Sequence, residues 1–142
     1  MEEYQYLEEY SEEELEKVIS EMPDIEEVPW AIDVLEEKNP QKAIEYVVDI
    51  IVNDKGDDYL QGTLWSFYFT AHKEDLLGAL RKRKESIGKA LLADIINSLT
   101  IFVDSADKDL IVRIQHDYAL ISSEDRTRML CDYTAFNEKF SI

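Results

Sequence analysis

Apolar residues recur every three or four positions along most of this chain, and short polar segments separate each run from the next. This period is typical of an amphipathic α-helix, which turns one apolar side toward a core. The expected inward positions, run by run from the N-terminus, are Leu15, Val18, Ile19 and Met22; Val28, Ala31, Ile32 and Leu35; Ala43, Ile44, Val47, Val48 and Ile51; Leu60, Leu64, Phe67, Tyr68 and Ala71; a short helix over residues 76–83; Ile87, Leu91, Leu92, Ile95, Ile96, Leu99 and Phe102; Leu110, Ile111, Ile114 and Tyr118; and Met129, Leu130, Tyr133 and Phe136.

Residues that favour helix ends stand between these runs. Ser11 followed by Glu14 matches a capping box, and Asn39 with Pro40 matches an N-cap and a first helical residue. Further helix starts are expected at Asp24, at Asp57 or Asp58, at Ser86, and at Ser122 or Ser123. The β-branched run VVDIIV at residues 47–52 is compatible with a strand, but the helical spacing on either side of it favours a helix.

The pattern predicts an all-α protein of seven to eight helices in antiparallel order. The connections are short, and helix pairs recur at about the forty-residue scale of HEAT-like units. We therefore expect an antiparallel helical array, either an α-solenoid (HEAT-like) or an irregular helical bundle, with a compact orthogonal bundle as the alternative. The length is that of one domain over residues 1–142, with an acidic N-terminal arm or helix at 1–22 and the helical array at 24–140.

Negative charge is concentrated at the N-terminus. The formal net charge is −17, and residues 1–37 hold fifteen Asp or Glu residues against one basic residue, Lys17. A field of this sign repels phosphate backbones and anionic lipids, so we expect no direct nucleic acid and no membrane partner. The only basic run, residues 81–84 with Lys89 just beyond, is either a solvated corner or an internal counter-surface for the acidic arm.

Residue types that bind metals or perform catalysis lack the spacing those functions need. Neither His72 nor His116 has a Glu or Asp three residues earlier or a second histidine at a spacing of four, and segments 53–58 and 104–109 do not match a calcium loop. Cys131 is interpreted as a buried thiol in a reducing cytoplasm. We expect no catalytic residue, no metal and no cofactor, and a non-enzymatic, cytoplasmic, monomeric protein without a membrane span.

Aromatic residues form two groups. Tyr4, Tyr6 and Tyr10 lie among glutamates, where they either contact a partner or fasten the first helix to the second. The second group lies on one expected helix and is interpreted mainly as core, although its members span more than half of the helix circumference. It consists of Tyr59, Trp65, Phe67, Tyr68 and Phe69.

Residues 56–99 read GDDYLQGTLWSFYFTAHKEDLLGALRKRKESIGKALLADIINSL. This segment resembles the central part of the small helical-repeat immunity proteins that protect bacteria from their own polymorphic or contact-dependent growth inhibition toxins. The resemblance lies in the helix from Tyr59 to Trp65, the charged turn before Leu76 and Leu77, and LLADIINS at 91–98. It implies a cytoplasmic binding protein that occupies a cognate toxin domain and has no catalytic residues.

The resemblance gives the acidic arm an expected role. Toxins that cut nucleic acid need cationic clefts, and an acidic surface can occupy such a cleft as phosphates would. The expected partner-binding residues are Glu2, Glu3, Tyr4, Tyr6, Glu8, Glu9, Tyr10, Glu12, Glu13, Glu16, Trp65 and Tyr68. Two other functions stay open: a HEAT-like scaffold or adaptor, and an acidic DNA mimic that inhibits a nucleic-acid-binding protein.

Overall fold

The computed structural model describes residues 2–140, and for Glu2 it describes the backbone alone. Helices take up 78% of these residues and strands none of them, which confirms the all-α prediction. The elements are η1 (Glu2–Glu9), α1 (Glu12–Glu21), η2 (Ile25–Glu27), α2 (Val28–Lys38), α3 (Pro40–Val52), α4 (Asp58–Tyr68), α5 (Lys73–Lys82), α6 (Lys89–Phe102), α7 (Lys108–Leu120), α8 (Ser123–Arg128) and α9 (Leu130–Lys139), where η denotes a 3-10 helix.

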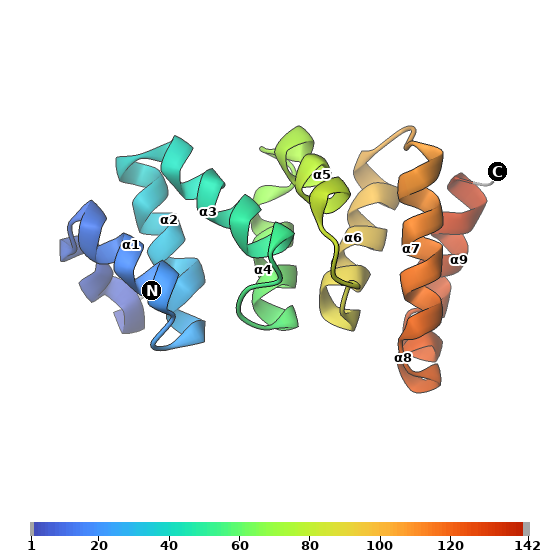
Figure 1. Ribbon diagram of the computed structural model, residues 1–142, viewed down its shortest axis with the longest axis horizontal. Helices are drawn as coiled ribbons and strands as arrows, with labels where there is room; N and C mark the ends of the chain where they lie inside the picture. Colours follow the sequence, from blue (N-terminus) through green and yellow to red (C-terminus); the bar gives the residue numbers. More distant parts are fainter. Residues whose placement is uncertain (1, 141–142) are drawn as a thin grey trace.

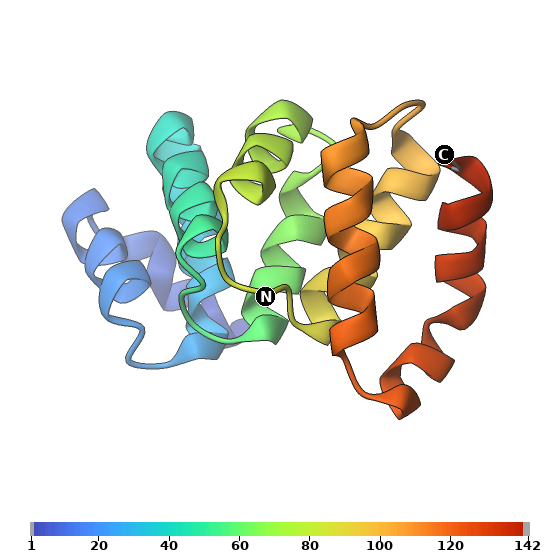
Figure 2. The same ribbon diagram turned by 45° about the vertical axis from the view of Figure 1, so that its right-hand side comes forward.

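The α-helices form a two-layer array that follows the sequence from one end of the molecule to the other (Figure 1). One layer contains α2, α4, α6 and α9, and α4 and α6 make the most extensive helix contact in the protein. The other layer contains α1, α3, α5 and α7, as the turned view also shows (Figure 2). The expected helical array is therefore confirmed, as an extended row of helix pairs.

Each helix pair is shorter than the forty residues expected from the sequence. The pairs begin at Glu12, Pro40, Lys73 and Lys108. Their connections are tight because N-caps follow closely after the preceding helix; Asn39, for example, both ends α2 and accepts a hydrogen bond from the Lys42 amide in α3. The run at residues 47–52 lies within α3, so the helical interpretation is correct there.

The capping signals are mostly where the sequence predicts them. Ser11 and Glu14 form the reciprocal capping box, with distances of 3.2 and 3.0 Å between their side-chain oxygens and the partner amides. The two neighbouring aspartates at the start of α4 have different roles. Asp57 caps α4 through the Leu60 amide, whereas Asp58 reaches across the layer and accepts hydrogen bonds from the first amides of α6.

One apolar core runs the whole length of the array, from Leu7 to Phe140. Helix α6 lies at its centre, as expected, because the side chains of Leu91, Leu92, Ile95, Ile96 and Leu99 are fully buried. Each layer shields the other from water, so the burial of these apolar stripes is the main source of stability.

The C-terminal segment differs from the prediction. It forms two helices, α8 and α9, because the chain bends at Met129. Met129 at the bend and Tyr133 and Phe136 of α9 face the core, so Leu130 is 54% exposed and Cys131 is exposed as well. The interpretation of Cys131 as a buried thiol was wrong, since this residue lies on the outer side of its helix.

Candidate partner-binding surface

The N-terminal tyrosines fasten η1 to the second helix. The ring of Tyr4 stacks on that of Trp30 at a centroid distance of 5.7 Å and an interplanar angle of 14°. The hydroxyl of Tyr6 donates a hydrogen bond to the carboxylate of Glu27 in η2, and the next residue, Leu7, is fully buried. Within the described residues, Tyr4 and Tyr6 thus fasten η1 to α2 and η2, a contact close to the fastening role that the sequence left open.

The surroundings of these tyrosines are strongly negative. The hydrogen bond to Glu27, with burial and the Glu27 charge adding to it, raises the pKa of Tyr6 to about 12. Burial raises the pKa of Tyr4, and the negative charges around it raise that pKa further. Those charges belong to Glu3, Asp24, Glu26 and Glu27.

The acidic face, as we name it here, consists of Glu3, Glu8, Glu9, Glu12, Glu13 and Glu16. Four of these residues are exposed, while Glu12 and Glu16 are half-buried. Glu16 alone pairs with a basic residue within residues 2–140, since its carboxylate lies 3.4 Å from the Lys42 ammonium and also accepts a hydrogen bond from Tyr46. The expected partner-binding residue Glu2 has its side chain outside the described part of the chain.

Trp65 and Tyr68 are core residues. Trp65 has no exposed surface and stacks on Phe69, and Tyr68 is 5% exposed. They were expected to contact a partner, but they offer it almost no surface, because α4 turns this side toward the other helices. The outer side of α4 carries Tyr59 and Phe67, which are 65% and 59% exposed.

A groove runs along that outer side between α2 and α4, and the sequence did not indicate it. Its volume is about 430 Å³, and we call it the α2–α4 groove. Its walls come from two separate parts of the chain, so only the folded arrangement brings them together. It is lined by Ile25, Glu26, Pro29, Trp30, Asp57, Tyr59, Leu60, Thr63 and Phe67.

Within residues 2–140, no ion pair links the basic run to the acidic arm. Arg83 is 3% exposed and donates five hydrogen bonds to groups of α3, α4 and the adjoining connections. Arg81 pairs with Asp107, and Lys89 lies 3.8 Å from Asp125. Arg81 lies at a solvated corner, as one of the two interpretations expected. Arg83 is buried, and its burial could not be predicted without knowing how the helices pack.

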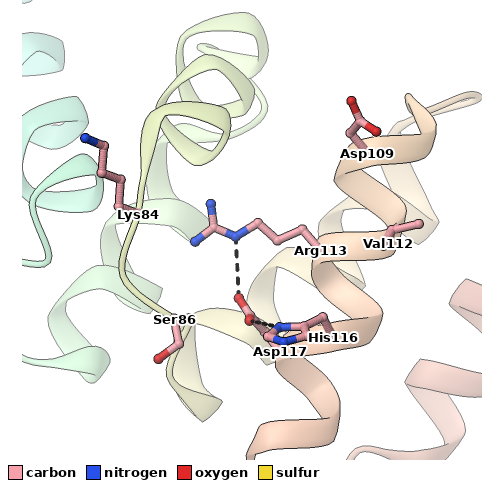
Figure 3. A pocket seen from close by; sticks show the side chains of 7 residues that line it. All are labelled: Lys84, Ser86, Asp109, Val112, Arg113, His116 and Asp117. Atoms are coloured by element: carbon pink, nitrogen blue, oxygen red, sulfur yellow. Dashed lines mark hydrogen bonds and ion pairs between the residues drawn. The ribbon is translucent and has the colours of Figure 1, made fainter.

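A second hollow, of about 440 Å³, lies on the opposite layer beside α7 (Figure 3). Asp117 is 3% exposed there; it accepts a hydrogen bond from the Ile87 amide and lies 3.0 Å from Nδ1 of His116. Arg113 donates to main-chain carbonyls of the α5–α6 connection. Ser86 points away from His116, so these side chains join two elements and form no nucleophile and base pair.

Within residues 2–140, no three side chains of the metal-binding types come together in a way that would hold an ion. No helix of this part of the chain has the length and apolar character that crossing a bilayer needs.

The fold and this surface define an all-α, two-layer helical array with an acidic end and an apolar groove. Comparisons with known proteins add no family to this description. No protein-family model, no curated protein and no solved structure matches the chain.

Proposed function

We propose that this chain is an immunity protein that binds a cognate bacterial toxin domain and neutralises it by protein–protein interaction. The observation that carries the proposal is the acidic face, which the fold holds in place and leaves almost free of basic partners. The resemblance of residues 56–99 to small helical-repeat immunity proteins gives the class of the partner.

The physical reason is electrostatic. A group of exposed carboxylates attracts a cationic protein over about 10 Å at ordinary salt concentrations and raises the rate of encounter. Toxins that cut nucleic acid present cationic clefts, so the acidic face would compete with phosphates for the same surface. An immunity protein also benefits from speed, because the toxin must be bound before it acts.

Co-expression tests the proposal. The toxin domain is sought at the C-terminus of a large secreted protein encoded in the neighbouring reading frame. We expect this domain to stop growth when it is expressed alone, to be harmless with the present chain, and to co-purify with it. A toxin domain that remains active and unbound beside the chain would refute the proposal.

An adaptor function is the second candidate, because the extended array and its exposed groove also suit a resident partner protein. In that case the chain would co-purify with an endogenous protein and give no protection against a toxin. A DNA mimic would instead be displaced from its partner by duplex DNA without any effect on a neighbouring toxin.

A further inference from the structure

We propose that the α2–α4 groove receives an apolar or aromatic side chain that is flanked by lysine or arginine on a segment of the partner protein. The identity of that partner as a toxin rests on the proposed function, whereas the chemistry of the groove rests on its own residues. The acidic face would then speed encounter, and the groove would hold the complex together.

The groove is built from aromatic rings of two helices. Trp30 of α2 forms one wall, and the stacked ring of Tyr4 supports it. Tyr59, Thr63 and Phe67 follow one another at one-turn spacing on α4, so the Cα atoms of the two aromatic residues lie about 12 Å apart along the helix axis. A volume of about 430 Å³ lies within the range of roughly 300–1,000 Å³ that binding pockets occupy.

The exposure of these rings indicates contact with another molecule. Tyr59 and Phe67 each leave more than half of their surface in water, and neither belongs to the apolar core or to the residues packed against it. Contiguous exposed apolar surface marks interaction sites, and buried aromatic anchors supply much of the binding energy at interfaces. The same helix buries Trp65 and Tyr68 on its other side, so the fold does not need the exposed pair.

The charge around the groove selects the occupant. Glu26 and Asp57 line it, no lysine or arginine does, and neither carboxylate has an ion-pair partner within residues 2–140. Three further carboxylates surround Tyr4, behind the Trp30 wall: Glu3, Asp24 and Glu27. A cationic protein segment complements this potential, whereas an anionic lipid surface or a nucleic acid is repelled.

The test measures binding of three dye-labelled peptides to the whole chain by fluorescence anisotropy. One peptide is Lys-Lys-Phe-Leu-Lys-Lys, the second replaces its Phe-Leu by Ser-Ser, and the third replaces its lysines by glutamates. We expect the first to bind about tenfold more tightly than the second, a difference typical of one good apolar anchor, and the third not to bind.

Variants of the chain locate the binding. The double variant Tyr59→Ala, Phe67→Ala should bind the first peptide about tenfold more weakly, because it lacks both exposed rings. The control is Ile101→Ala, Leu120→Ala, which removes side chains that are 60% and 61% exposed on other helices and should bind as the parent chain does.

Equal binding of the lysine peptides with and without Phe-Leu, unchanged binding by the double variant, or no binding at all would each overturn the groove proposal. These outcomes leave the proposed function intact, because the acidic face could act alone. If the chain binds the peptide in the groove but fails to protect against the toxin domain, the toxin is not the partner, and the proposed chemistry of the groove still holds.

Discussion

Two arginines of the same short basic run, Arg83 and Arg81, have different structural roles. The Arg83 guanidinium donates five hydrogen bonds, among them to the Ile51 carbonyl, to the side-chain oxygen of Gln61 and to Asp54. All five donors of this planar group are therefore satisfied while it is excluded from water. Two positions earlier, Arg81 forms an exposed pair with Asp107.

This contrast predicts very different effects of the same substitution. Arg83→Met keeps the length of the side chain but leaves buried carbonyl groups without donors, so we expect it to lower the free energy of unfolding by about 2–4 kcal/mol. Arg81→Met removes an exposed pair and should cost less than about 1 kcal/mol. Urea unfolding followed by circular dichroism measures both, and equal losses would show that Arg83 is not a structural group.

The sequence could not separate these two arginines. Both stand in one basic run, and three of the five hydrogen-bond partners of Arg83 come from residues 22 to 32 positions earlier in the chain. Charge pattern therefore predicted the run but not the burial of one member. The same limit explains Trp65 and Tyr68, whose burial depends on which side of α4 faces the other layer.

At the scale of elements, Gly62 sets how closely α4 and α6 approach. A Cβ atom at this position would lie 2.7 Å from a carboxylate oxygen of Asp94 and 3.2 Å from the main chain of Ala90. Gly78 in α5 is the opposite case, because a Cβ atom there would meet nothing within 4 Å.

Alanine substitutions at the two glycines should therefore change stability in opposite directions. Gly62→Ala pushes α6 away from α4, and we expect this overpacking to outweigh the better helix propensity and to cost about 1–2 kcal/mol. Gly78→Ala should stabilise the chain by about 0.5–1 kcal/mol through helix propensity alone. Thermal melting of both variants checks the signs, and a stabilising Gly62→Ala would contradict the close approach.

Helices and most of their starts could be predicted because both signals are local. Apolar spacing and the Ser11–Glu14, Asn39 and Ser122 caps depend on residues within one or two turns. The role of Asp58 could not be predicted, since its carboxylate caps a helix that begins some thirty residues later. The α2–α4 groove was missed for the same reason: Trp30 and Tyr59 meet only through the packing of two helices.

At the scale of the whole molecule, negative charge gathers at one end of the array. Most of the net charge of −17 belongs to the first 37 residues, and η1 and α1 lie at the N-terminal end of the row (Figure 1). The composition predicted this charge but did not show whether the acidic segment packs against the rest of the protein. The burial of Leu7 and the stacking of Tyr4 on Trp30 hold η1 against α2, and this contact joins separate parts of the chain.

The central claim is that this charged end steers a cationic toxin domain. Replacing Glu8, Glu9, Glu12 and Glu13 by Gln changes side chains that form no ion pair within residues 2–140, so we expect less than about 0.5 kcal/mol of lost stability per site. Association should be slower than for the parent chain, while dissociation should change less.

A matched variant removes the same amount of charge from the other end of the molecule. It replaces four exposed carboxylates that form no ion pair within the described residues. These substitutions are Asp104→Asn, Asp109→Asn, Asp132→Asn and Glu138→Gln.

Stopped-flow association of the toxin domain with the parent and the two variants, at several salt concentrations, is the most direct measurement. Between about 0.05 M and 0.5 M salt the Debye length falls from roughly 14 Å to 4 Å, so long-range attraction is lost. We predict that the parent and the matched variant bind fast at low salt and slow down strongly, whereas the acidic-face variant is slow throughout. Equal association rates for all three proteins at every salt concentration would contradict the account.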